Sequence, residues 1–165
     1  ARGAQVGDFT ESVDVLPTIL DWIGVPVPDQ VDGRSLTPFV HDGTTPEGWR
    51  DEVHWQWAFG NPDLRFAEEL LGVPAEHCSL QVVRTADWKY VQFATDPELM
   101  PPLLFDLRAD PDQLVNLADD PAHAGTLAEY AQRLVRWRLR HEDRTLSTFH
   151  LSGARGLVHH ADPRR

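Results

Sequence analysis

The first regular pattern of hydrophobic and polar positions lies between residues 14 and 24. The apolar residues that recur there at helical spacing, on one face, are Leu16, Ile19, Leu20 and Ile23. Asp14 is a suitable N-cap, Pro17 is tolerated in a first helical turn, and Gly24 can end a helix in the left-handed conformation. We predict a short amphipathic helix over about residues 14–24 that docks against a larger surface.

Residues 25–50 are rich in proline and glycine and have no sustained apolar period. Prolines and glycines at this density interrupt helices and strands. We predict a long loop that covers a surface, with one helical turn around residues 36–40.

The pattern changes to strict alternation over residues 52–59. Val53, Trp55 and Trp57 fall on one face of the predicted strand, and His54 falls on the other. The sequence favours Trp55 and Trp57 as core residues of a sheet. His54, on the opposite face, is a candidate for the rim of a pocket.

Three further β-rich runs follow, at residues 79–85, 88–94 and 103–107. The first two are separated by Ala86-Asp87, which indicates a hairpin. Together with residues 52–59 they predict an antiparallel sheet of about four strands. Asn61-Pro62 predicts the start of a helix through Leu71, and a longer amphipathic helix is expected from about Pro121 to His141. The segment is therefore expected to be α+β.

Composition and charge restrict the partners of this chain. It has 165 residues with 15 Lys and Arg against 26 Asp and Glu, a formal net charge of −11. Such a surface repels phosphate backbones and anionic lipids, so we expect neither nucleic acid nor membrane as a partner. It also repels a sulfate or phosphate ester, so a site for such a substrate would need strong local positive charge.

The single cysteine, Cys78, excludes an internal disulfide and fits cytosolic folding. We interpret it as a small core residue. The chain begins at Ala1 without a methionine or a leader peptide, which leads us to expect that it starts within a longer protein.

Candidate chemistry within the chain is sparse. The eight histidines do not form His-x-x-x-His or His-Glu-x-x-His units, and no Gly-x-Ser-x-Gly or glycine-rich phosphate loop occurs. The acidic pairs near Asp110 and Asp120 lack the pattern of a calcium-binding loop and are interpreted as caps and turns. We therefore assign no catalytic, cofactor-binding or metal-binding residue.

Four short motifs nevertheless occur in a recognisable order. They are Ser12-Val-Asp-Val-Leu-Pro-Thr-Ile-Leu20, Asp32-Gly-Arg-Ser-Leu36, Arg84-Thr-x-x-Trp-Lys-Tyr90 and Leu104-Phe-Asp-Leu-x-x-Asp-Pro111 with Asn116-Leu117. In that order they resemble the C-terminal third of sulfatases, in the alkaline-phosphatase superfamily. The stretch from Cys78 through Phe105, and Trp137-Arg-x-Arg-His141 followed by Arg144-Thr-Leu146, further resemble the phosphonate monoester hydrolase branch.

The resemblance implies a domain organisation. Residues 1–50 would be the end of a large α/β domain, 51–142 a C-terminal subdomain with a small antiparallel sheet and one long helix, and 143–165 an extended tail. The positions that match structural motifs of the family are Asp14, Pro17, Thr18, Gly33, Arg34, Lys89, Asp106, Asp110 and Asn116.

The resemblance also implies an activity of a full-length parent: hydrolysis of sulfate, phosphonate or phosphate esters with a divalent metal (Ca, Mn or Zn) and a formylglycine made from cysteine. Cys78 is followed by Ser-Leu-Gln, which does not match the family's Cys-x-Pro-x-Arg motif. The active site would therefore lie upstream, and this segment alone would be inactive.

The expected partners are the N-terminal catalytic part of the same parent chain and a small anionic ester. The alternative function is a non-catalytic binding or oligomerisation module. In either case the C-terminal helix and tail could form contacts in a homo-oligomer.

Overall fold

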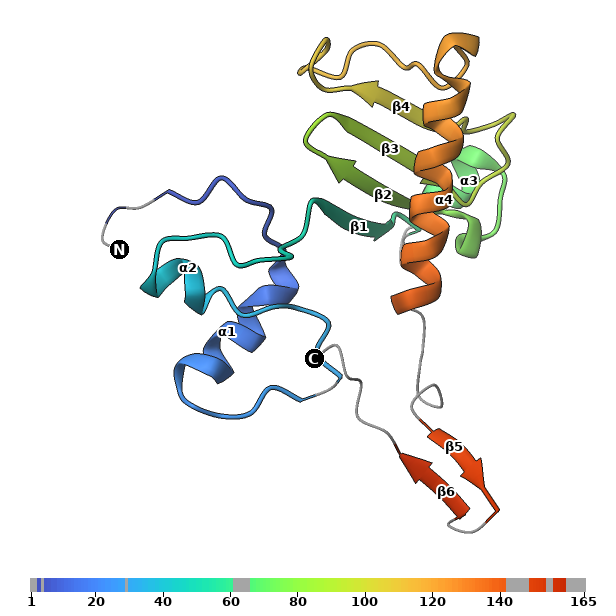
Figure 1. Ribbon diagram of the computed structural model, residues 1–165. Coiled ribbons are helices and arrows are strands. Elements are labelled where there is room, and N and C mark those ends of the chain that lie inside the picture. Colours follow the sequence, from blue (N-terminus) through green and yellow to red (C-terminus); the bar gives the residue numbers. More distant parts are fainter. Residues whose placement is uncertain are drawn as a thin grey trace. The chain divides into compact units, whose positions relative to one another are not determined.

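The structure is a computed structural model that describes residues 3, 5–28, 30–60, 66–141, 149–153 and 156–159 (Figure 1). The chain divides into two compact units, one formed by residues 51–137 and the other by residues 1–50 together with 138–165. Each unit has its own local architecture. In the part of the chain described, no helix combines the length and the apolar composition that crossing a membrane requires.

The helix predicted near the N-terminus is present. A 3-10 turn, η1 (Ser12–Asp14), leads directly into α1 (Val15–Trp22). Gly24 follows with φ +73°, so it supplies the left-handed stop that the sequence predicted. The helical turn expected in the long loop is α2 (Thr37–His41), which confirms that prediction as well.

The predicted four-stranded antiparallel sheet is confirmed. Its strands are β1 (Glu52–Ala58), β2 (Ser79–Thr85), β3 (Trp88–Phe93) and β4 (Leu103–Asp106), and they pair in chain order. Between β1 and β2 the chain forms α3 (Phe66–Leu71) and a 3-10 turn, η2 (Ala75–His77). The predicted helix start at Asn61-Pro62 lies outside the described residues.

One long helix covers one face of this sheet (Figure 1). It is α4 (Ala124–His141), and it is preceded by a 3-10 turn, η3 (Pro121–His123). The buried residues of the core between helix and sheet are Val83, Tyr90, Leu104, Ala118, Tyr130 and Leu134. This core forms because one face of the sheet and one stripe of α4 are both apolar.

The expected burial of Trp55 and Trp57 is wrong. Their exposed fractions are 55% and 54%, so both rings are half in solvent. The face of β1 that turns toward α4 instead carries His54, whose ring stacks on Trp137 of that helix. Alternation along a strand predicts which residues share a face, but it does not predict which face a helix will cover.

The C-terminal region contains two strands where the sequence predicted only an extended tail. They are β5 (Phe149–Ser152) and β6 (Gly156–His159), and they pair in antiparallel fashion from Phe149 opposite His159 to Ser152 opposite Gly156. Each strand has four residues, which is too short for a clear alternating pattern.

Candidate functional site

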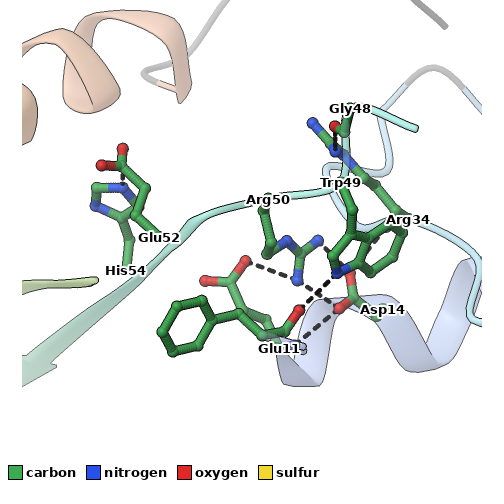
Figure 2. Close-up of polar contacts among 9 residues, drawn as sticks. Glu11, Asp14, Arg34, Gly48, Trp49, Arg50, Glu52 and His54 are labelled. Carbon is green, nitrogen blue, oxygen red and sulfur yellow. Dashed lines mark hydrogen bonds and ion pairs between the residues drawn. The ribbon is translucent and has the colours of Figure 1, made fainter. Parts of the chain in front are cut away.

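The most tightly connected polar site is an ion pair between Asp14 and Arg50 (Figure 2). The Asp14 side chain is fully buried, and the guanidinium of Arg50 donates to both carboxylate oxygens, at 2.5 and 2.6 Å. Arg50 also lies 3.1 Å from a carboxylate oxygen of Glu11. This bidentate contact, with two parallel hydrogen bonds, is the geometry in which arginine binds a carboxylate most strongly.

Two backbone amides complete the surroundings of the Asp14 carboxylate. The amide of Glu11 donates to Oδ2 at 2.8 Å, and the amide of Arg34 donates to Oδ1 at 2.9 Å. Asp14 occupies the N-cap position of α1, but its side chain accepts no capping hydrogen bond from that helix. The predicted N-cap position is thus confirmed, but the carboxylate does not cap the amides of α1. It joins η1, the loop after α1 and Arg50, because four donors in those segments converge on it.

The charge of Asp14 is maintained by these donors. Burial alone would raise the pKa of the carboxyl group, but the hydrogen bonds from Arg50 and from the amides of Arg34 and Glu11 outweigh it, so the pKa of Asp14 lies below its ordinary value. A carboxyl group whose pKa is lower in the folded state contributes stability above its unfolded pKa, and that stability is lost as the pH falls through the folded pKa.

We therefore expect acid to weaken the unit that contains Asp14. The wild-type protein should exceed Asp14→Asn in stability at about pH 6, and this difference should narrow as the pH falls below about 4. Thermal unfolding midpoints of both proteins, measured across that range, check the prediction. A difference that stays constant with pH would contradict it.

Two neighbouring positions attach the loop to α1. The hydroxyl of Thr18 donates to the Asp14 carbonyl oxygen at 2.5 Å and accepts from the Leu36 amide at 2.9 Å. The guanidinium of Arg34 donates to the carbonyl oxygen of Gly48 at 2.8 Å (Figure 2). These contacts hold a loop that has little regular structure of its own.

Gly33 lies in the closest backbone contact of this site. A Cβ atom at Gly33 would overlap the carbonyl group of Val13 and the amide nitrogen of Asp14. The loop can approach η1 this closely only because residue 33 has no side chain. Pro17, the remaining predicted motif position in this unit, is buried in the first turn of α1.

In the other unit, His54 lies beneath α4. Its side chain is 4% exposed, its ring stacks on Trp137 with 4.4 Å between centroids, and its Nε2 lies 3.0 Å from Glu52. Glu52 also pairs with Arg133 of α4 at 3.0 Å, and both contacts hold the pKa of Glu52 below its usual range. A role for His54 at the rim of a pocket stays a prediction.

The predicted motif residues around β4 hold turns. The carboxylate of Asp106 accepts from the Arg108 amide at 2.9 Å, and that of Asp110 accepts from the Val115 amide at 2.8 Å. Lys89 donates to the side-chain oxygen of Gln113 at 2.7 Å. The interpretation of Asp110 as a turn residue is confirmed.

Asn116 joins two segments through three hydrogen bonds. Its side-chain oxygen accepts from the amides of Leu104 and Ala118, and its amide group donates to the carbonyl oxygen of Pro102. Asn116 therefore attaches the segment before α4 to the edge strand β4.

The described residues do not fit a metal or a nucleophile. Among them, no group of three or more His, Cys, Asp or Glu side chains is placed to hold a metal ion. Cys78 is fully buried, as expected of a core residue, and burial together with the nearby Glu68 and Glu76 raises the pKa of its thiol. A buried thiol with a raised pKa is a poor nucleophile.

Comparison with known proteins defines the class to which this fold belongs. The chain is 39% identical to the phosphonate monoester hydrolase of Agrobacterium radiobacter, with a TM-score of 0.82 over 96% of this chain and 30% of that one. The phosphonate monoester hydrolase from Silicibacter pomeroyi is 35% identical, with a TM-score of 0.79 over 97% of this chain and 31% of that one. The fold is thus that of the C-terminal part of sulfatase-like hydrolases in the alkaline phosphatase superfamily.

The sequence match narrows this class to a family. The chain belongs to the family described as N-sulphoglucosamine sulphohydrolase, C-terminal, which matches residues 1–140. It is 44% identical to the multifunctional alkaline phosphatase superfamily protein PehA of Trinickia caryophylli, over 91% of this chain and 28% of that protein. It is 33% identical to arylsulfatase K of Homo sapiens, over 70% of this chain and 20% of that protein. The chain therefore spans less than a third of the length of these relatives.

Proposed function

We propose that this chain is the C-terminal segment of a metal-dependent hydrolase that cleaves sulfate or phosphonate and phosphate esters. The observation that carries the proposal is the family match over residues 1–140, together with the close structural similarity to two phosphonate monoester hydrolases. The segment would have a structural role and would help to cover the substrate pocket. The chemistry would take place on polypeptide that precedes it.

The exposed apolar side of the first helix supports a role in a larger protein. The residues on or next to α1 that are at least half exposed are Val13, Val15, Leu16, Ile19, Trp22 and Ile23. An apolar surface of this kind favours a covering partner, since complete burial of such a side chain contributes about 1.5–3 kcal/mol and roughly half of that remains to be gained at each position. In a longer hydrolase, this partner would be the large domain.

The divalent metal and the formylglycine would also be held by the preceding polypeptide. Within the described residues neither group has a fitting site, because no acidic or histidine cluster is placed to bind a metal and Cys78 is buried outside a Cys-x-Pro-x-Arg context. When bound, the metal would polarise the ester oxygens. Assembly into a homo-oligomer through the C-terminal helix and tail stays a prediction.

The test uses the full-length protein with three substrates: an aryl sulfate, a phosphonate monoester and a phosphodiester. We expect turnover of at least one of them, and we expect a chelator to lower kcat/KM by more than about tenfold, because the metal stabilises the charge of the transition state. Restoring the metal should restore the rate. Undiminished activity in the presence of chelator would refute metal dependence, and no turnover of any ester would refute the hydrolase assignment.

A further inference from the structure

The long helix α4 has an exposed side with a regular pattern of its own. Tyr130 and Leu134 belong to the stripe of α4 that packs on the sheet (Figure 1). Because a helix turns by about 100° per residue, a second set of residues lies on the far side of the helix from that stripe. We refer to this set as the outer stripe; its residues are Ala128, Gln132, Val135 and Leu139, and all four are exposed.

The spacing of the outer stripe is that of a surface on which helices pair. Its residues follow one another at intervals of four, three and four positions, which is the repeat that two helices use when they pack side by side. Val135 and Leu139 have exposed fractions of 57% and 66%. Two large apolar side chains on successive turns, both outside the core of the unit, favour burial against another helix.

The charged residues beside the outer stripe change sign along the helix. Glu129 and Arg136 each follow a residue of the stripe directly, so they lie on the same flank of it. The side chain of Glu129 is 54% exposed and pairs with Arg133 of the same helix at 2.9 Å. Arg136 is exposed and forms no ion pair within the part of the chain that the structure describes.

The charge of the whole chain restricts which surfaces of two copies can meet. With a net charge of −11, most surfaces of this chain repel a second copy. The C-terminal half of α4 is an exception, since it carries four arginines: Arg133, Arg136, Arg138 and Arg140. Basic residues at a helix end suit the macrodipole, but the macrodipole does not explain why apolar residues lie exposed between them.

We propose that the outer stripe is an interface at which α4 packs antiparallel on α4 of a second copy of this chain, around a two-fold axis. Val135 then lies against Gln132 of the second copy, and Leu139 lies against Ala128. Glu129 meets Arg136 of the second copy, and the symmetry makes each of these contacts twice. A parallel pair would instead set Arg136 against Arg136, which is unfavourable.

The proposal gives a geometry to the homo-oligomer predicted from the sequence, and it does not depend on the proposed ester hydrolysis. An interface made by one helix from each copy is small, so we expect a dissociation constant of about 1–100 µM.

Sedimentation of the full-length protein tests the interface through its charges. Arg136→Glu should weaken self-association by at least about tenfold, because it sets two carboxylates against each other on both sides of the two-fold axis. Adding Glu129→Arg to the same chain reverses both members of each pair. This double variant should return to within about threefold of the wild-type dissociation constant.

Arg108→Glu is the matched control. Arg108 is 75% exposed and lies outside α4, and the substitution changes the net charge by the same amount. Its dissociation constant should stay within about twofold of the wild-type value. Equal dissociation constants for Arg136→Glu and Arg108→Glu would overturn the proposal. So would a double variant that associates no better than Arg136→Glu, or a wild-type protein that stays monomeric up to about 100 µM.

Disulfide cross-linking tests the orientation of the two helices. A mixture of Gln132→Cys protein with Val135→Cys protein should cross-link at least about fivefold faster than either variant alone, because the antiparallel pair sets these two positions together. Cys78 is fully buried and does not compete. If Val135→Cys alone cross-links as fast as the mixture, the antiparallel arrangement is wrong.

Ester hydrolysis measured on the same samples separates this inference from the proposed function. A protein that dimerises through α4 but hydrolyses no ester would refute the proposed function and leave the interface intact. An active protein that stays monomeric would refute the interface alone.

Discussion

Replacing Arg50 by alanine is expected to raise the rate of native-state hydrogen exchange in α1 steeply. Asp14 is fully buried, and Arg50 donates to both of its carboxylate oxygens. Removing one partner of a buried ion pair leaves an uncompensated charge and costs about 3–5 kcal/mol. Exchange of the α1 amides, read by mass spectrometry of the full-length protein, gives the free energy of local opening for this unit.

A surface arginine provides the matched control. Arg108 pairs with Asp87 at 2.5 Å, but its side chain is 75% exposed, so Arg108→Ala should cost less than about 0.5 kcal/mol. Arg50→Lys keeps the positive charge but loses the bidentate contact. Its loss in the opening free energy of α1 should therefore lie between the losses of the two alanine variants. If Arg50→Ala lowers the opening free energy of α1 no more than Arg108→Ala does, the ion pair does not stabilise this unit.

Gly33→Ala is expected to lower the opening free energy of α1 about as much as Arg50→Ala does. The new methyl group would overlap backbone atoms of Val13 and Asp14, and backbone cannot rotate out of the way as a side chain can. Moving the loop would stretch the hydrogen bond from the Arg34 amide to Asp14. We expect a loss of at least about 3 kcal/mol in the opening free energy of α1, at the upper end of overpacking effects.

Gly125→Ala is the control for this substitution. Gly125 lies in the first turn of α4, and a Cβ atom there would meet nothing within 4 Å. Alanine has a higher helix propensity than glycine, so this variant should gain about 0.5–1 kcal/mol in the stability of α4. A Gly33→Ala protein with unchanged exchange in α1 would show that the loop can shift without cost.

The regular elements of the second unit were predictable because their patterns are strong. Alternation over residues 52–59 and the β-rich runs over 79–85 and 88–94 predicted three strands that the structure confirms almost to the residue. The helical period before His141 likewise predicted α4. For β1 and α4, one local period extends over enough residues to distinguish strand from helix.

The orientation of the sheet was not predictable from those patterns. β1 carries tryptophans on one face and His54 on the other, and hydrophobicity favours the tryptophans as the buried side. The structure buries His54 instead, because Trp137 of α4 covers its ring and Glu52 accepts its hydrogen bond. The deciding contact lies far along the chain, so no local pattern contains it.

The ion pair of the first unit was missed for a similar reason. The resemblance placed Asp14 and Arg34 among the structural positions, but nothing in the spacing of the sequence pairs Asp14 with Arg50, 36 residues later. Arg50 stands at the end of a loop without a regular period. Its role follows only from the folded path of that loop, which brings it back to the start of α1.

The long loop of the first unit is ordered by a few contact points rather than by regular secondary structure. Residues 33–36 touch the start of α1 through Gly33, Arg34 and Leu36, and residues 45–50 return to the N-terminal segment through Thr45, Trp49 and Arg50. Between these contacts, α2 is also held, because Phe39 is buried edge-on against Trp49 and His41 stacks on Trp22. Natural variation in length should therefore concentrate between the end of α2 and Thr45, since lengthening a loop whose ends are fixed costs only a few tenths of a kcal/mol per added residue or less.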